Sequence, residues 1–224
     1  MIITIDGPAG SGKSSVASIL AQRLSLFHLD TGAMYRAVAL DGLERGILAD
    51  AAGLANRARE MRLAFDFRCE PARLIMDGRD VSEAIRTPAV TQVTYISADN
   101  PQVRSELVRQ QQKIGTEAER EKGGLVTEGR DQGTVVFPEA DFKFYLDAKP
   151  EERARRRIAQ LAEKGVRVDG ADLLRQIIQR DAQDQARPVG ALKVPDNAII
   201  LDTTDLTLDQ VVEKMYEMIK KRGN

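Results

Sequence analysis

The segment GPAGSGKSS begins at Gly7, directly after the apolar run MIITID at the N-terminus. This run is β-branched and is followed by Gly-Pro, so it predicts a buried strand. The next residues, KSSVASILAQRL, have the spacing of a helix. Glycine loses more backbone freedom on folding than other residues, so glycines weaken both strands and helices. Three glycines between these two elements therefore predict a loop with a specific use.

Residues 7–14 fit the pattern G-x-x-x-x-G-K-[ST], known as the Walker A motif or P-loop, and they have the required strand before and helix after. In such a loop backbone N–H groups point at phosphate oxygens, and the following helix adds its positive dipole end. Lys13 would place a cation at the β- and γ-phosphates, and the Ser14 hydroxyl would ligate Mg²⁺. The alternative is a glycine turn that contains Lys-Ser by chance. The predicted nucleotide-binding residues are Gly7, Pro8, Ala9, Gly10, Ser11, Gly12, Lys13, Ser14 and Ser15.

Short apolar strands alternate with helical segments along most of the chain. After the first strand, strands are predicted at 26–30, 125–129, 142–148 and 198–203. This alternation implies an α/β fold with a parallel sheet covered on both faces. Residues 62–81 break the rhythm, because they contain alternation and turn signals with no crossover helix, and they predict a small antiparallel insert. A helical region at 87–119 leads back to the strand at 125–129.

Composition excludes several classes of function. The formal net charge is −1, so no global positive field recruits nucleic acid or a membrane surface. Cys69 is the only cysteine, which rules out an internal disulfide and fits a reducing cytosol. The N-terminus lacks the features of a signal peptide, and no apolar stretch approaches the roughly 20 residues that cross a bilayer. His28 is the only histidine, which argues against Ser-His-Asp triads and multi-histidine metal sites.

Arginines away from the loop indicate where a second anion would bind. Arg36 lies in a helix after the second predicted strand, where open α/β sheets bind ligands. Thr31 would cap that helix and donate to an anion. Arg130 and Asp131 follow another buried strand. The alternatives are a capped surface helix at the first place and a structural ion pair at the second.

Two charged helices are predicted at 150–165 and 172–187. Each carries charged residues at i,i+3 and i,i+4 spacing, which places them on one face. Solvated faces paired with nearby carboxylates such as Glu151 and Glu152 are the alternative. Guanidinium groups bind phosphate oxygens bidentately, so the two helices and their linker EKGVRVDG predict a lid over a triphosphate. The residues on these faces are Arg153, Arg156 and Arg157 on the first helix, and Arg180, Asp184 and Arg187 on the second.

The segments IDGPAGSGKS, LDTGAMYR, EGRDQGTVVFP and RDAQDQAR resemble, in order and approximate spacing, the motifs of the bacterial cytidylate kinases, the CMP/dCMP kinase family. The resemblance covers essentially the whole chain. It implies a P-loop NTPase nucleoside monophosphate kinase fold, in which helices flank a parallel β-sheet and a small antiparallel insert binds the monophosphate. It also implies one kinase domain over 1–224, with a core at 1–60 and 97–224, the insert at about 61–96 and the lid at about 150–187.

The resemblance further implies which residues bind the acceptor. Its assignments are Thr31, Arg36 and Arg130 at the acceptor phosphate, Tyr35 lining the site, Arg104 at the pyrimidine, Asp131 at the cytosine amino group, Arg180 and Asp184 at the sugar, and Arg187 near the transferred phosphate. The chain departs from the family where a base-contacting serine is frequent. Tyr95 occupies that position in a gap-free alignment, and Ser97 would replace it if the register shifts.

The expected reaction is ATP + (d)CMP → ADP + (d)CDP, with ATP and Mg²⁺ as the implied cofactors. The predicted catalytic residues are Lys13, Arg130, Arg187, Arg153 and Arg157. A kinase for UMP, AMP or another small-molecule phosphate acceptor is the alternative enzyme, and a nucleotide-binding regulator is the alternative of another class. We expect a cytoplasmic monomer whose partners are nucleotides, with no nucleic acid or membrane partner.

Overall fold

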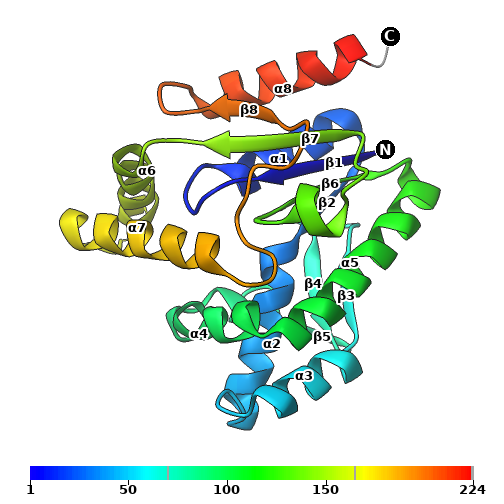
Figure 1. Cartoon of the computed structure of the whole chain (residues 1–224), viewed down its shortest axis with the longest axis vertical. Coiled ribbons are helices and arrows are strands. Elements are labelled where there is room, and N and C mark those ends of the chain that lie inside the picture. Colours follow the sequence, from blue (N-terminus) through cyan, green and yellow to red (C-terminus); the bar gives the residue numbers. More distant parts are fainter. Residues whose placement is uncertain (70, 164, 223–224) are drawn as a thin grey trace. The chain divides into compact units, whose positions relative to one another are not determined.

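The computed structural model describes residues 1–69, 71–163 and 165–222, which fall into two compact units (Figure 1). The first unit contains Met1–Ser25 and the chain from Val126 onward, and the second unit is Leu26–Leu125. Glu70 of the predicted insert and Lys164 of the predicted lid lie outside the described residues. The division into core, insert and lid stays a prediction.

The first unit is built on a sheet whose strands β6 (Leu125–Gly129), β1 (Ile2–Asp6), β7 (Phe142–Asp147) and β8 (Ile199–Asp202) lie in that order. Strand β7 runs parallel to both β1 and β8, with Ile5 opposite Phe144 and Phe144 opposite Ile199. The central strands are fully buried at Ile3, Ile5, Phe144 and Leu146, as expected for a parallel sheet covered on its faces. The helices of this unit are α1 (Lys13–Leu24), α6 (Pro150–Glu163), α7 (Gly170–Ala186) and α8 (Leu208–Arg222).

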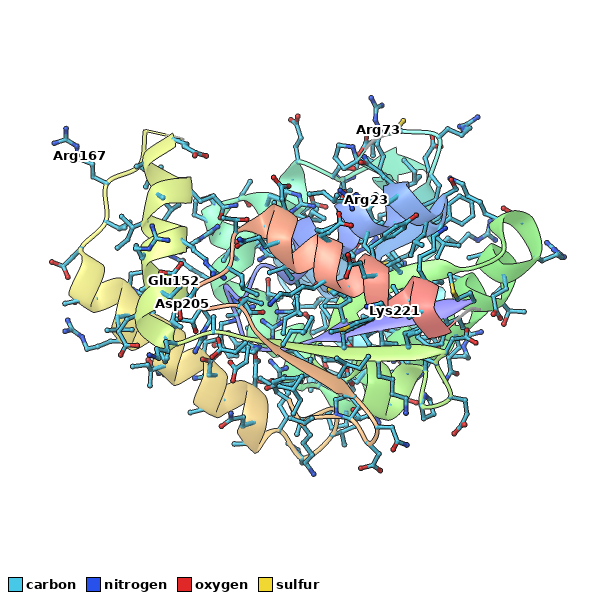
Figure 2. All side chains as sticks on the ribbon, turned by 90° about the horizontal axis from the view of Figure 1, so that it is seen from above. Arg23, Arg73, Glu152, Arg167, Asp205 and Lys221 are labelled. Atoms are coloured by element: carbon cyan, nitrogen blue, oxygen red, sulfur yellow. The ribbon has the colours of Figure 1, made fainter. Side chains whose placement is uncertain are left out.

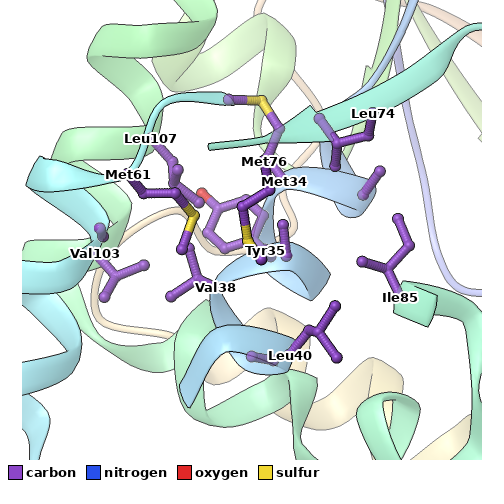
Figure 3. Packing of buried hydrophobic residues seen from close by; sticks show 14 of the residues in the cluster. Met34, Tyr35, Val38, Leu40, Met61, Leu74, Met76, Ile85, Val103 and Leu107 are labelled. Atoms are coloured by element: carbon purple, nitrogen blue, oxygen red, sulfur yellow. The ribbon is translucent and has the colours of Figure 1, made fainter. Parts of the chain in front are cut away.

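The second unit joins helices to a small antiparallel sheet. Strand β4 pairs with β3 and with β5, which confirms the antiparallel segment predicted at 62–81. Its core packs residues of α2 against side chains from α5 and the small sheet, and Figure 3 shows Met34, Val38, Met76 and Leu107 in this cluster. The elements are β2 (Phe27–Asp30), α2 (Thr31–Arg45), α3 (Ala51–Glu60), β3 (Leu63–Asp66), β4 (Arg73–Met76), β5 (Arg79–Asp80), a 3₁₀ turn (Ala84–Arg86), α4 (Pro88–Asp99) and α5 (Pro101–Lys122).

The helical region predicted at 87–119 is confirmed and consists of two helices, α4 and α5. The break falls at Asn100, whose side-chain oxygen accepts from the backbone N–H groups of Gln102 and Val103 and so caps α5. Pro101 follows at the first helical position, where its missing N–H costs nothing. Among the described residues, no helix is long and apolar enough to span a membrane.

We expect Leu107→Ala to lower the free energy of unfolding by about 2–5 kcal/mol, because its side chain is fully buried in the core of the second unit and truncation leaves a cavity. Leu43→Ala on α2 is the matched control, since Leu43 is 40% exposed and its loss should change stability by no more than about 0.5 kcal/mol. Urea denaturation of both variants measures the difference. Equal effects of the two substitutions would contradict this packing.

Candidate active site

The loop between β1 and α1 has the backbone that a P-loop requires. Gly10 and Gly12 have φ values of 79° and 91°, in the left-handed region that favours glycine. At Gly7 a Cβ atom would lie 2.1 Å from the carbonyl oxygen of Leu146 at the end of β7, so only glycine fits there. The loop is therefore pressed against the carboxyl end of the sheet, where ligands bind in this type of fold.

Lys13 begins α1 and is only 5% exposed. Its Nζ donates to the carbonyl of Pro8 at 2.7 Å and to Ser11 Oγ at 3.3 Å, so the side chain is folded back along the loop. Burial, followed by repulsion from Arg130, lowers the pKa of Lys13 to about 7. A buried ammonium in this position is stabilised by an arriving anion, because opposite charge favours the charged form.

Two carboxylates that were not predicted lie at strand ends beside the loop. Ser14 Oγ donates to Glu128 Oε1 on β6 at 2.7 Å. Asp6, at the end of β1, accepts from the backbone N–H groups of Gln132 and Gly133 at 2.8 and 2.7 Å. Burial raises the pKa of Asp6 to about 6 against the lowering effect of these two donors. Their place at the carboxyl ends of apolar strands was the available signal in the sequence.

The chemistry of this donor set fits a magnesium ion. Mg²⁺ prefers oxygen ligands and keeps several waters, taking one or two carboxylates together with substrate phosphates. The hydroxyl of Ser14 and the carboxylate of Glu128 are adjacent oxygens of that kind. No group of three or more His, Cys, Asp or Glu side chains that could hold a metal occurs among the residues that the structure describes. An ion held by Ser14 and Glu128 would take its further ligands from water and nucleotide phosphates, as Mg²⁺ commonly does.

Asp184 on α7 holds two of the predicted arginines. Arg130 Nε lies 2.7 Å from Asp184 Oδ2, and Arg187 Nη2 lies 2.5 Å from Asp184 Oδ1. Burial would raise the pKa of Asp184, but the two guanidinium groups lower it below its ordinary value. The ion pair considered for Arg130 thus exists, and its partner comes from α7. Both guanidinium groups are fixed by one buried carboxylate.

Asp131 is buried and starts a π-helical turn, Gln132–Val136, immediately after β6. Its backbone carbonyl accepts from the N–H groups of Val135 and Val136 at 2.9 and 3.2 Å. The conformation of Asp131 is therefore fixed by main-chain bonds. Arg180 lies exposed on α7.

The basic residues predicted on one face of α6 lie in different surroundings. Arg153 is buried and donates to the carbonyls of Ala148 and Ala9, each at 2.9 Å. Arg156 donates to Thr203 in the segment after β8 and to Glu152, which is labelled in Figure 2. Arg157 is exposed and donates to Gln160 at 2.5 Å. The solvated face considered as the alternative is therefore wrong for Arg153.

In the second unit the capping prediction for Thr31 is wrong. Thr31 is the first residue of α2, and the cap is Asp30, whose carboxylate accepts from the backbone N–H of Ala33 at 3.1 Å. The cap position requires extended backbone before the helix, and β2 runs directly into α2 at that residue. Arg36 on the same helix donates to Thr91 Oγ1 at 2.8 Å and to the carbonyl of Ile85 at 3.4 Å.

Tyr35 and Arg104 form one cluster in the second unit. The Arg104 guanidinium carbon lies 5.2 Å from the centre of the Tyr35 ring, and Arg104 Nη1 donates to the carbonyl of Ala98 at 3.0 Å. Ser97 is fully buried, and its hydroxyl lies 2.8 Å from the carbonyl of Tyr35. Tyr95, in contrast, is 57% exposed. Ser97 therefore supports the backbone beneath Tyr35.

The predicted residues divide between the two units along the chain. Thr31, Tyr35, Arg36 and Arg104 belong to the second unit. The loop, Lys13 and the residues from Arg130 to Arg187 belong to the first unit, where Arg130, Asp184 and Arg187 are brought together. The first unit can thus hold an anion among buried cations, and Ser14 and Glu128 add oxygen donors for a cation.

Comparisons with known proteins agree on one family. The family model described as "Cytidylate kinase" matches residues 3–221. A cytidylate kinase of Citrifermentans bemidjiense is 46% identical over 224 residues, covering 99% of this chain and 94% of that protein. A cytidylate kinase of Caldanaerobacter subterraneus is 46% identical over 220 residues, covering 98% of this chain and 94% of that protein.

A solved structure shares the fold at low sequence identity. The crystal structure of an uncharacterized protein from Eubacterium ventriosum has a TM-score of 0.50 and 12% identity, covering 98% of each chain. This likeness concerns the fold alone. The family model and the two relatives cover nearly the whole length at far higher identity, and together with the P-loop they show that the chain belongs to the cytidylate kinase family.

Proposed function

We propose that this protein transfers the γ-phosphate of ATP to CMP or dCMP, giving ADP and CDP or dCDP. The proposal rests on one observation in a chain of the cytidylate kinase family. The unit that contains the P-loop also contains the buried carboxylate of Asp184, which fixes the guanidinium groups of Arg130 and Arg187. The reducing cytosol inferred from Cys69, and the monomeric state, stay predictions.

The chemistry needs no general base. The nucleophile is a phosphate oxygen of CMP, and with a second pKa of about 6 it is largely ionised at pH 7. Catalysis then consists of aligning the two phosphates and stabilising the charge that develops between them. A reaction without a general base agrees with a chain that has a single histidine. The buried cations Lys13 and Arg153 lie at the loop.

On the ATP side, residues 7–15 would surround the phosphates, and the backbone N–H groups from Gly10 onward would donate to them, as in other loops of this pattern. Lys13 would turn its ammonium from Pro8 and Ser11 to the β- and γ-phosphates. Ser14 and Glu128 would hold Mg²⁺. When bound, that ion supplies positive charge to the phosphate oxygens. The buried arginine Arg153 and the exposed Arg157 would complete the positive surroundings of the triphosphate.

On the acceptor side, Arg36 and Arg130 would hold the CMP phosphate in line, and Arg187 would act on the phosphate during transfer. Asp184 would have two tasks, since it fixes Arg130 and Arg187 and would also contact the sugar. A carboxylate there can hold the 3′-hydroxyl when the 2′-hydroxyl is missing, so dCMP would also bind. The remaining residues in this proposal are Thr31 at the phosphate, Tyr35 lining the site, Arg104 and Asp131 at the base, and Arg180 at the sugar.

Base selection would depend on the hydrogen bonds that cytosine offers. Cytosine has an amino donor at N4 beside acceptors at N3 and O2, so Asp131 can accept from the amino group and Arg104 can donate to the acceptors. Uracil has an oxygen at that position and would face the carboxylate without a hydrogen. A buried polar group without a partner costs about 1–3 kcal/mol, which is a discrimination of one to two orders of magnitude.

A panel of acceptors tests the proposal directly. We expect ADP release from ATP to depend on added acceptor and to be fastest with CMP and dCMP, measured by a coupled assay with CMP, dCMP, UMP and AMP. Faster turnover with UMP or AMP would instead make the protein another small-molecule P-loop kinase. Acceptor-independent, slow turnover would make it a nucleotide-binding regulator.

We expect Lys13→Ala to lower kcat on the order of 100-fold or more, because it removes a cation matched to the charge of the transition state. Circular dichroism should be unchanged, since the Lys13 side chain contacts the loop and not the hydrophobic core. Lys214→Ala, at an exposed position on α8, is the matched control. A Lys13→Ala variant with near-normal kcat would exclude the phosphate-binding role of the loop.

We expect Asp131→Asn to reduce the ratio of kcat/KM for CMP over UMP by about tenfold or more, worth roughly 1.4 kcal/mol. The amide loses the charge that strengthens the bond to cytosine N4, and it can donate to O4 of uracil. The main-chain bonds of Asp131 remain, so the local backbone should persist.

Arg130→Lys is the comparison variant for this experiment. Arg130 is proposed to contact the acceptor phosphate, which CMP and UMP share, so its loss should lower activity towards both together. If Asp131→Asn also depresses both acceptors equally, Asp131 supports the structure of the site and does not select the base.

A further inference from the structure

We propose that Asp181, a residue to which no role was assigned above, is a positioning residue for ATP: together with Arg153 it fixes the P-loop at Ala9. This inference rests on one part of the proposed function, namely that the phosphates of ATP bind to this loop. It concerns the first unit, which contains the loop, α6 and α7.

The ion pair holds both polar backbone atoms of a single loop residue. Arg153 Nη1 donates to Asp181 Oδ2 at 2.6 Å and to the carbonyl of Ala9 at 2.9 Å. Asp181 Oδ1 accepts from the backbone N–H of Ala9 at 3.3 Å. The donor and the acceptor of Ala9 are thus bound by the two members of one pair, one carried by α6 and the other by α7.

The pair is buried, unlike the pairs that Arg155 and Arg175 make on the same two helices. The side chain of Arg153 is 4% exposed and that of Asp181 is 13% exposed. Arg155 and Arg175, which pair with Glu152 and Asp172, are more than two-thirds exposed. Exposed pairs contribute little, whereas removing one partner of a buried pair leaves a charge without compensation. Arg153 Nε is held as well, by the carbonyl of Ala148, so the guanidinium has little freedom.

The attachment point is suited to control the loop. Ala9 directly precedes Gly10, whose left-handed backbone begins the turn towards Lys13. A Cβ atom on Gly10 would lie 3.3 Å from Arg153 Cβ, so α6 and the loop also approach closely at this residue. Because the Ala9 N–H is bound to Asp181, it is not available to a phosphate in this arrangement. Asp181 therefore acts by fixing the loop and not by touching ATP.

The experiment compares Asp181→Asn with Asp172→Asn, a matched change at an exposed position on the same helix. Two quantities are measured: hydrogen exchange of the peptide that covers residues 7–12 in the nucleotide-free protein, and KM for ATP and for CMP. For Asp181→Asn we expect faster exchange in the loop and a rise of about tenfold or more in KM for ATP, with KM for CMP changed by less than about twofold. Asp172→Asn should change none of these.

A double variant tests whether Asp181 acts through Arg153. If it does, adding Asp181→Asn to Arg153→Gln should raise KM for ATP by less than about twofold further, because the two residues form one unit. If the two substitutions instead multiply their effects on KM for ATP, Asp181 does not act through Arg153. If Asp181→Asn does not fold, Asp181→Glu is measured in the same way and the same two quantities decide.

Unchanged exchange in the loop, or equal effects on both KM values, would overturn the proposal and leave Asp181 a structural residue of α7. The exchange measurement uses the protein without nucleotide. It therefore tests Asp181 even if the acceptor panel shows that the protein does not phosphorylate CMP, and the two failures can be told apart.

Discussion

Buried positive charge beside the P-loop is the constraint on which the first unit depends. Lys13, Arg130 and Arg153 belong to this unit, and each of them is held by acceptors. The loop itself supplies carbonyls, but the carboxylates come from elsewhere in the sequence, above all from α7. Offsetting this charge therefore fixes the position of α7, because a buried charge without a partner is costly.

The same constraint bears on how this unit would meet the phosphates of the proposed reaction. Burial, followed by repulsion from Arg130, lowers the pKa of Lys13 to about 7, so the charged form of Lys13 is disfavoured in the protein alone. In the proposed function, phosphate oxygens would favour the charged form by placing negative charge beside it. The binding energy of the triphosphate is thus directed at the part of the molecule where charge develops during transfer.

The strands around the loop and the antiparallel insert could be predicted from the sequence. The spacing of apolar residues and the positions of turn residues are local signals, which a single sequence contains. The cap of α2 was missed, because Asp30 and Thr31 both have a capping side chain and only the backbone decides between them. The partners of Arg130 and Arg153 could not be predicted either. They lie on α7, far along the chain, and i,i+3 spacing shows a shared face without showing what that face meets.

Helix α7 joins these features into one mechanical element. Asp181 and Asp184 are three residues apart, so they lie on the same face of the helix, and with Ile177 they make up its buried side. One carboxylate holds Arg153 and Ala9, and the other holds Arg130 and Arg187. Because both carboxylates are carried by one turn of α7, a shift of that turn would displace both of them. The cations assigned to ATP and those assigned to the acceptor phosphate are therefore ordered together, which suits an enzyme that must align two phosphates before transfer.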